Sequence, residues 1–242
     1  MTSLILHAGA SSTTRDDVMN VATPPRQGSH YPISHGGMVV SALSILQRGG
    51  YQITKESHAL TKDGDRYFGV FDLAIEGTDD WGLTLGVRNT HDKSFSSGIV
   101  LGTRVFVCDN LAFSGEIKLA RKHTRFINRD MPGLMARALG RLGDHRNKSE
   151  QRIAAYQGME MNDMAAHDII VRAVDVKAIP GQAIPHVLQE WRKPSFPDFE
   201  ARNAWSLFNA FTEVYKLSSV DITRTRAQAL HGLFDSSVGL AV

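Results

Sequence analysis

A short polar segment, NTHDKS at residues 89–94, lies between two apolar runs and carries side chains that can take part in catalysis. The imidazole of His91 titrates near neutral pH, and the adjacent carboxylate of Asp92 can orient it as a general base. Adjacent residues of an extended chain point to opposite faces, so the pair converges only through a turn. Asn89, Thr90 and Asp92 are also residue types that bond to nearby backbone groups and shape turns. The segment therefore favours a structural turn, with catalysis as the alternative.

The catalytic alternative has defined roles. If the protein is an enzyme, we expect His91 to act as the base, Asp92 to orient it and His123 to assist, in a metal-assisted cleavage of phosphodiester bonds. We expect no resident metal and no cofactor, because the ten histidines lack ligand spacing and the single Cys108 cannot build a thiolate cluster. Cys108 ends an apolar run and is expected to be buried. Walker, GxSxG and GxGxxG motifs are absent from the sequence, so an enzyme is the less favoured class.

Positive charge is concentrated in one part of the chain. The whole sequence has a formal net charge of +2, whereas residues 118–152 hold ten Lys or Arg and three acids, a local balance of 10 − 3 = +7. Such a segment can neutralise phosphates, and the interleaved Phe126 can stack on an unpaired base. The alternative is a solvated helix face whose charges pair with the acids Asp72, Glu76, Asp79 and Asp80. The size of the local excess favours nucleic-acid binding.

The polar turn supplies further candidates, because its cationic and amide side chains can contact phosphate while Asp92 holds the turn. The residues that we expect to contact nucleic acid are Arg88, Asn89, Lys93, Lys118, Arg121, Lys122, Arg125, Phe126, Arg129, Arg137 and Arg141.

An antiparallel sheet is predicted to hold these residues. Roughly five strands follow one another between about residues 51 and 115 with short connections, which favours an antiparallel meander. Asp63 and Gly64 form the clearest hairpin turn, in which Gly64 needs a positive φ. The sheet is expected to pack against N-terminal and mostly C-terminal helices. The predicted fold class is α+β.

Helices are predicted on both sides of the sheet segment in sequence. Thr14 followed by acidic residues indicates a short helix, and residues 37–47 indicate a long one. Helical patterning resumes after residue 129 with a break near Gly143, and a further helix is expected around residues 186–191. In NAWSLFNAFTE, Trp205 and Phe208 recur at helical spacing, so we expect them on the buried side of a helix.

The chain of 242 residues, 42% hydrophobic, is long enough to bury a sizeable core. We predict a single domain over residues 1–242, with a less ordered N-terminal extension of about 30 residues. One cysteine and no long apolar stretch predict a cytoplasmic protein without a membrane span.

Three motifs together resemble a known family. The three motifs are the strand ending in RNTHD together with the later glycine and VFVCDN, the RKHT segment and the helix WSLFNAFTE, and they are similar to the phage- and plasmid-borne family catalogued as domain of unknown function 932. Thr90 stands where that family usually has serine. The matching residues are Arg88, Asn89, His91, Asp92, Gly102, Val105, Val107, Cys108, Asn110, Arg121, His123, Thr124, Trp205, Asn209, Ala210, Thr212 and Glu213. The resemblance covers most of residues 30–217 and implies a mobile-element origin, hence the cytoplasm of a bacterial host.

The order of strands followed by a basic helix is similar, more loosely, to single-strand annealing recombination proteins. This similarity concerns topology, which does not establish function. We predict a phage- or plasmid-encoded protein that binds single-stranded nucleic acid, with DNA favoured over RNA, as a homo-oligomer that acts in recombination. A counter-defence protein that binds a host protein is a third alternative, and it has no sequence mark.

Overall fold

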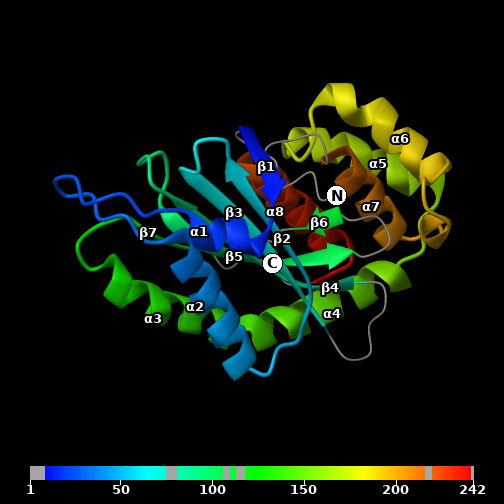
Figure 1. The fold of residues 1–242 in the computed structure, drawn as a ribbon. Helices are drawn as coiled ribbons and strands as arrows, with labels where there is room; N and C mark the ends of the chain where they lie inside the picture. Colours follow the sequence, from blue (N-terminus) through cyan, green and yellow to red (C-terminus); the bar gives the residue numbers. More distant parts are fainter. Residues whose placement is uncertain (1–8, 75–80, 106–109, 113–117, 216–219, 241–242) are drawn as a thin grey trace. The chain divides into compact units, whose positions relative to one another are not determined.

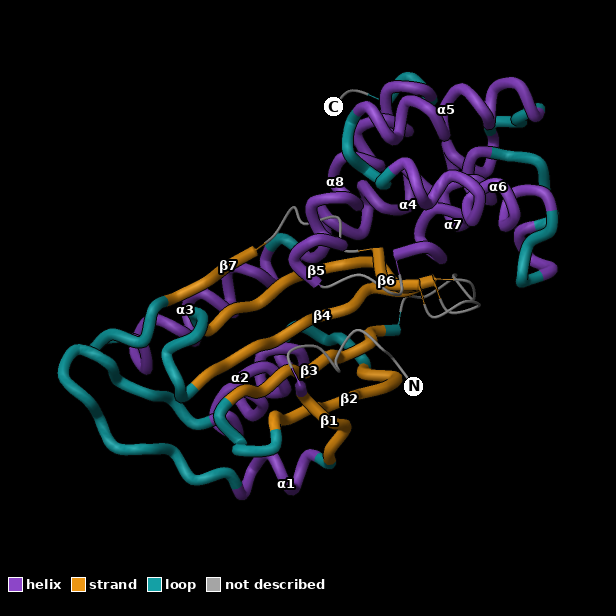
Figure 2. Tube along the Cα trace, turned by 90° about the horizontal axis from the view of Figure 1, so that it is seen from above, coloured by secondary structure: helices purple, strands orange, loops and turns teal. Residues whose placement is uncertain are grey.

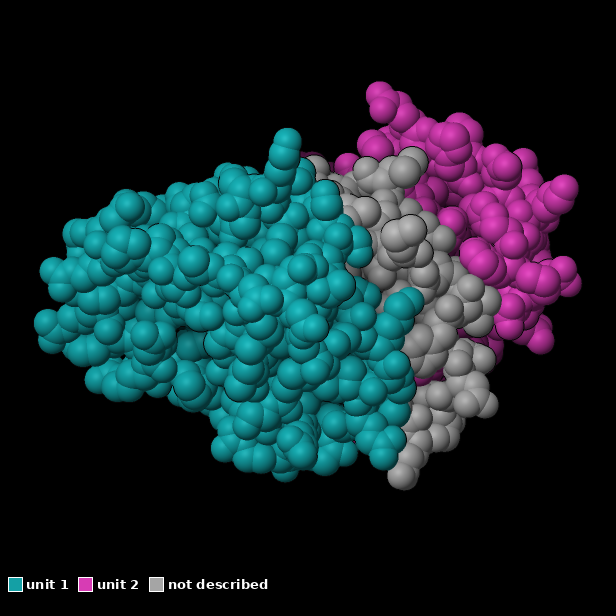
Figure 3. Space-filling view, viewed as in Figure 1, with its two compact units in different colours: residues 1–78, 82–102, 116–143 teal, residues 79–81, 103–115, 144–242 magenta. Residues whose placement is uncertain are grey.

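A computed structural model of the chain describes residues 9–74, 81–105, 110–112, 118–215 and 220–240. Internal contacts divide the chain into two compact units (Figure 3). Unit 1 comprises Met1–Thr78, Gly82–Gly102 and Glu116–Gly143, and unit 2 comprises Asp79–Trp81, Thr103–Gly115 and Asp144–Val242. The chain therefore passes between the units several times, and a single domain over residues 1–242 stays a prediction.

The strands follow one another across one sheet in the order in which they occur along the chain (Figures 1 and 2). In this order they are β1 (Ala10–Thr13), β2 (Ile53–Thr61), β3 (Arg66–Leu73), β4 (Trp81–Thr90), β5 (Ser97–Val105) and β6 (Asn110–Ala112). A seventh strand, β7 (Lys118–Arg121), pairs antiparallel with β5. The meander and the α+β class predicted from sequence are confirmed.

The hairpin between β2 and β3 has the predicted turn. Gly64 has φ 74°, a left-handed conformation that glycine adopts without steric cost, and its N–H donates to the Thr61 carbonyl at 2.8 Å. Asp63 accepts from the Thr61 hydroxyl and from the Asp65 backbone N–H at 3.0 Å. Turn residues alone fix this hairpin, which places Asp65 and Gly64 at one end of the sheet in unit 1.

Two helices of unit 1, α2 (His35–Arg48) and α3 (Ile127–Gly140), cover one face of the sheet. Their apolar side chains meet Leu85 and Val87 of β4 and Ile99 of β5. Because every second residue of a strand shares a face, Asn89 of β4 also points to the helix side, as does Tyr67, its partner on β3. Arg88 points to the opposite side of the sheet.

Local capping residues define where the first helices start. Thr14 caps α1 (Arg15–Asn20) in a capping box with Asp17, which confirms the predicted helix start. The Ser34 hydroxyl caps α2 by accepting from the N–H of Gly37. The predicted long helix at residues 37–47 lies within α2, so the cap sets its first turn directly beside the polar residues at the end of the sheet.

Unit 2 contains the C-terminal helices. They are α4 (Leu142–Gly158), α5 (Asp163–Asp175), α6 (Ile184–Arg192), α7 (Ala204–Tyr215) and α8 (Val220–Ser237), with short 3-10 turns η3 (Gly181–Ala183) and η4 (Pro197–Phe199). The predicted helix break near Gly143 falls at Arg141, which ends α3. The helix predicted around residues 186–191 is part of α6.

Helix α7 carries the predicted NAWSLFNAFTE pattern and is buried on more than one side. Trp205 and Phe208 stack with ring centroids 5.9 Å apart, and Phe208 meets Phe234 of α8 edge to face. The buried residues of α7 run from Ala204 to Thr212 without interruption. The predicted burial of Trp205 and Phe208 is confirmed, and the opposite side of the helix is buried as well.

The N-terminal segment, predicted to be less ordered up to about residue 30, contains β1 and α1 between residues 9 and 30. Strand β1 pairs antiparallel with β2. Residues 1–8 lie outside the described residues. Cys108, which was expected to be buried, lies outside them as well. Of the helices that the structure describes, none combines the length and the apolar character that a membrane crossing requires.

Candidate functional site

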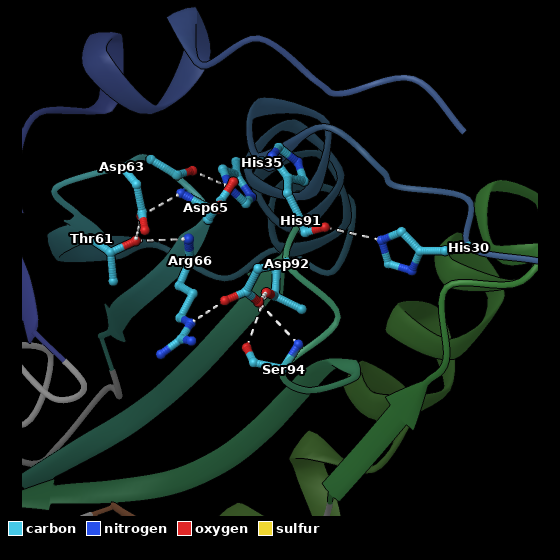
Figure 4. Close-up of polar contacts among 11 residues, drawn as sticks. His30, His35, Thr61, Asp63, Asp65, Arg66, His91, Asp92 and Ser94 are labelled. Atoms are coloured by element: carbon cyan, nitrogen blue, oxygen red, sulfur yellow. Dashed lines mark hydrogen bonds and ion pairs between the residues drawn. The ribbon is translucent and has the colours of Figure 1, made fainter. Parts of the chain in front are cut away.

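Residues 89–94 form the turn that leads out of β4, and Asp92 holds it together (Figure 4). The Asp92 carboxylate accepts hydrogen bonds from the Ser94 backbone N–H at 3.0 Å and from the Thr90 hydroxyl, and it pairs with the Arg66 guanidinium at 2.6 Å. Partial burial opposes ionisation of Asp92, but the contacts with Ser94, Thr90 and Arg66 outweigh it and hold the pKa of Asp92 well below its usual range. This carboxylate therefore stabilises the turn.

Asn89 is the centre of a buried hydrogen-bond network. Its side-chain amide donates to the Ile33 carbonyl at 2.8 Å and to Nδ1 of His35 at 2.8 Å. Its side-chain carbonyl accepts from the Ser97 hydroxyl at 2.5 Å and from Nε2 of His123 at 3.0 Å. Asn89 and His35 are fully buried. One asparagine therefore ties β4 to α2, β5 and the segment after β7, because all of its donors and its acceptor are used.

Four histidines surround this asparagine, and we call them the histidine cluster: His30, His35, His91 and His123. The His35 and His91 rings stack at 3.9 Å, and the His30 and His123 rings lie 5.0 Å apart. His91 donates from Nε2 to the Ile33 carbonyl at 2.9 Å, and His30 donates from Nε2 to the His91 carbonyl at 3.1 Å. The cluster joins three distant parts of the sequence, residues 30–35, 91 and 123, and Figure 4 shows His30, His35 and His91.

The contacts of His35 fix its protonation state. Its Nε2 faces the Gly64 carbonyl at 3.0 Å, which only accepts, so this nitrogen carries the proton. Its Nδ1 accepts from Asn89 and has no room for a second proton. Burial, followed by the charge of His91, lowers the pKa of His35 to about 4. Burial, followed by neighbouring histidines, also lowers the pKa of His123 to about 4, so both rings are uncharged at neutral pH.

The catalytic alternative required Asp92 to orient His91 as a general base, and the two side chains do not bond in this way. His91 bonds to the Ile33 carbonyl, whereas Asp92 bonds to Arg66 and to its own turn. Nε2 of His123 lies 2.9 Å from the Ser97 hydroxyl, but its proton faces Asn89. Among the described residues, no group of three or more His, Cys, Asp or Glu is placed to hold a metal ion. This geometry favours a structural role for His91, Asp92 and His123.

The basic segment lies on β7, on the loop that follows it, on α3 and on the first part of α4. Lys122, Arg125, Arg137 and Arg141 are exposed and form no ion pair with any residue that the structure describes. Lys118 begins β7. The segment from β7 to the end of α3 therefore presents cations to solvent.

Two other arginines of the segment share one acid. Asp130 pairs with the guanidinium of Arg121 at 2.6 Å and with that of Arg129 at 2.9 Å. Arg121 is half-buried, whereas the side chain of Arg129 is 70% exposed. A single carboxylate between two guanidinium groups leaves one positive charge over, so the pair of arginines still contributes to the positive potential of the loop.

Phe126 lies at the centre of these cations. Its ring is 39% exposed, and the guanidinium carbons of Arg125 and Arg129 lie 4.3 and 4.4 Å from the ring centroid. Both distances are typical of cation–π contacts. We call Lys122, Arg125, Phe126 and Arg129 the basic–aromatic surface. It offers a flat apolar ring and several cations to the same ligand.

The alternative was that the basic segment pairs with four acids of the sheet region, and the structure describes one of these acids. Asp72 of β3 is buried and accepts from the Thr84 hydroxyl of β4 at 3.0 Å. Asp72 is thus part of the sheet interior, where it cannot neutralise an exposed cation of the loop after β7. Glu76, Asp79 and Asp80 lie outside the described residues.

The three residues expected to contact phosphate at the polar turn have different environments in the structure. Asn89 is fully buried with its amide occupied, which leaves no group of it for a phosphate. Arg88 points to the other side of the sheet, where its guanidinium lies over Phe95 at 5.0 Å. Lys93 is exposed and donates to the Gln27 side chain at 3.2 Å. Of these three residues, only Lys93 is exposed.

Sequence reasoning missed the segment that precedes α2. The N–H of Tyr31 donates to the His123 carbonyl at 2.9 Å, and Arg26 lies over the Tyr31 ring at 5.0 Å. In the sequence this segment is RQGSHY, in which a basic residue and an aromatic residue flank a glycine turn. Nothing in its local pattern relates it to residue 123, because the contact spans more than 90 residues.

No family model, no curated protein and no solved structure matches the chain. The resemblance to the family of domain of unknown function 932 therefore stays a prediction.

Proposed function

We propose that the protein binds single-stranded nucleic acid, with DNA as the favoured form, through the basic–aromatic surface. The observation that carries this proposal is the exposed ring of Phe126 between two guanidinium groups. An unpaired base can stack on such a ring once a guanidinium group moves from the ring to a phosphate, and the cations then neutralise the phosphates on either side of the base. Lys93, Arg137 and Arg141 are further exposed cations of unit 1.

Single strands fit this surface better than duplexes. The bases of a duplex are stacked on one another, so their faces are not offered to a protein side chain. A cationic surface without an aromatic ring would bind both forms through their phosphates. Phe126 therefore favours single strands.

The charge of the surface supports a salt-sensitive affinity. Each phosphate contact on a single strand contributes a slope of about −0.7 to the dependence of log affinity on log salt concentration. Three or four cations in contact with phosphate give a slope of roughly −2 to −3. Lys122, Arg125 and Arg129 are the exposed cations of the surface and account for most of this value.

The motif resemblance and the order of the strands support a further step of the proposal. Proteins of phage and plasmid origin with a similar order of elements anneal complementary single strands during recombination, and they assemble into rings or filaments. We propose the same role and a homo-oligomeric state for this protein. Light scattering coupled to size-exclusion chromatography measures the state, and annealing of complementary strands measures the activity.

The test is fluorescence anisotropy of a labelled oligothymidylate and of a labelled duplex between about 50 and 200 mM salt, where electrostatic binding changes steeply. Arg125→Ala and Lys122→Ala are expected to flatten the salt slope by about 0.7 each. Phe126→Ala is expected to weaken single-strand binding with no change of slope, because phenylalanine carries no charge.

Matched controls come from exposed cations elsewhere in unit 1. Arg48→Ala at the far end of α2 and Lys55→Ala on β2 remove the same charges. A helix of 14 residues is about 21 Å long, so Arg48 is remote from the residues at the start of α2. Equal effects of control and surface variants, or no single-strand binding by the wild type at about 50 mM salt, would contradict the proposal.

A further inference from the structure

The segment before α2 forms a second aromatic platform next to the basic–aromatic surface. Gln27 and His30 exchange two backbone hydrogen bonds of 3.0 Å around Gly28, whose φ is 59°. This tight turn is followed by Tyr31, which is partly exposed and carries the Arg26 guanidinium 5.0 Å from its ring centroid. The arrangement of Arg26 and Tyr31 repeats that of an arginine on Phe126.

Direct contacts hold this segment beside the two loops of the site. Tyr31 donates its backbone N–H to the His123 carbonyl at 2.9 Å. Lys93 donates to the Gln27 side chain at 3.2 Å, and the His30 ring lies against the His123 ring. Segments around residues 27–31, 91–93 and 123 therefore meet at one place, through the partly buried His30 and the buried His91 and His123.

The backbone segments that carry the two rings lie close together. His123, which is bonded to Tyr31, is three residues from Phe126, so the Cα atoms of His123 and Phe126 are at most about 11 Å apart. Nucleotides of one strand rise about 3.4 Å each when stacked, and more when extended. A strand of several nucleotides is therefore long enough to reach from the backbone at Tyr31 to the backbone at Phe126.

We infer that Tyr31 and Arg26 form the second half of the single-strand site, so that one strand places one base on Phe126 and another on Tyr31. This inference rests on the proposed function and deepens it by naming the ligand as an oligonucleotide of several unpaired bases. A mononucleotide occupies only one ring. Arg26 and Lys93 contact phosphates near Tyr31, as Arg125 and Arg129 do near Phe126. Base stacking without hydrogen bonds to base edges makes the site tolerant of sequence.

The test measures binding of oligothymidylates of increasing length to Tyr31→Ala, Tyr31→Phe and Arg26→Ala. The backbone contact between Tyr31 and His123 survives substitution of the side chain. Tyr31→Ala is expected to weaken single-strand binding by roughly 5- to 150-fold, the usual range for one stacked base, with no change of salt slope. Tyr31→Phe keeps the ring and should bind like the wild type. Arg26→Ala should flatten the slope by about 0.7.

The outcomes separate the inference from the proposed function. If Phe126→Ala loses affinity while Tyr31→Ala and Arg26→Ala bind like the wild type, the inference is wrong and the proposed function stands. If the wild type binds no single strand, the proposed function itself fails. If Tyr31→Ala does not fold, Arg26→Ala and Tyr31→Trp decide. Tyr31→Trp should then show fluorescence quenching by oligothymidylate in excess of the wild type, and equal quenching overturns the inference.

Discussion

Acidification from pH 7 to pH 4.5 is expected to destabilise the protein through the histidine cluster. His35 is fully buried, and it faces the ring of His91, the ring of Tyr67, the amide of Asn89 and the Gly64 carbonyl. These groups bond to the neutral ring, and among the described residues no carboxylate contacts His35 to stabilise a charged one. In the unfolded chain the ring protonates freely, so protons favour unfolding.

The sign and the size follow from the pKa of His35, which falls from 6.5 to about 4 on folding. The unfolded state binds more protons between these values, so stability is complete above pH 6.5 and is lost as the pH falls towards 4. At 1.36 kcal/mol per pKa unit the full contribution of His35 is about 3 kcal/mol, of which about 2 kcal/mol is lost by pH 4.5. The lowered pKa values of His91 and His123 act in the same direction.

Urea denaturation followed by circular dichroism at pH 7, 6, 5 and 4.5, at constant ionic strength, measures this loss. The matched variant is His35→Leu, which keeps the bulk but does not titrate. It is expected to be less stable at pH 7, because Asn89 and Gly64 lose a hydrogen-bond partner. Its stability should nevertheless depend less on pH, by about 2 kcal/mol between pH 7 and 4.5.

Measurements above pH 4.5 distinguish the effect of the histidines on stability from the effect of Asp92. Asp92 also has a lowered pKa, but its contribution to stability is present above its ordinary value of 3.8 and is lost only below it. A wild-type protein equally stable at pH 7 and pH 4.5 would refute the reasoning. So would a His35→Leu variant with the full acid sensitivity of the wild type.

Four further substitutions test the fold by urea denaturation at pH 7. Trp205→Ala should cost on the order of 3 kcal/mol or more, because the ring is buried and stacked on Phe208, and an unchanged midpoint would mean that the ring is not part of the core. Gly64→Ala should cost about 1 to 2 kcal/mol because φ is 74°, whereas Gly133→Ala within α3 should stabilise by about 0.5 to 1 kcal/mol, and equal effects of the two would contradict the turn assignment. Asp235→Ala should cost about 3 to 5 kcal/mol, because its carboxylate pairs with Arg152 and accepts from the Tyr156 hydroxyl in the interior of unit 2, and a cost below about 1 kcal/mol would contradict this pairing.

Sequence patterns predicted the turns and helix starts that depend on contacts between residues close together in the chain. The Asp63 and Gly64 turn, the helix start at Thr14 and the turn around Asp92 all depend on contacts within five residues of one another. Helix α7 followed from the spacing of Trp205 and Phe208. Such contacts need no distant partner, so the sequence alone shows them.

The opposite orientations of Arg88 and Asn89 could have been predicted from the sequence. Arg88 and Asn89 are adjacent on β4, and strand alternation sends them to opposite sides of the sheet. The apolar neighbours at positions 85 and 87 share a side with Asn89, which marks this asparagine as buried. The same rule, applied to the strand, would have removed Asn89 from the expected phosphate contacts and placed Arg88 on the other face of the sheet.

The sequence by itself determined the meander, the main helices and a concentration of positive charge around Phe126. Only the tertiary structure decided which histidines meet, that Asn89 joins them, and that Tyr31 lies beside His123. These contacts join residues 30 to more than 90 positions apart, and no local propensity encodes them. They form because packing α2 and the segment after β7 onto one end of the sheet buries polar groups, and buried polar groups must find partners with each other once water is excluded.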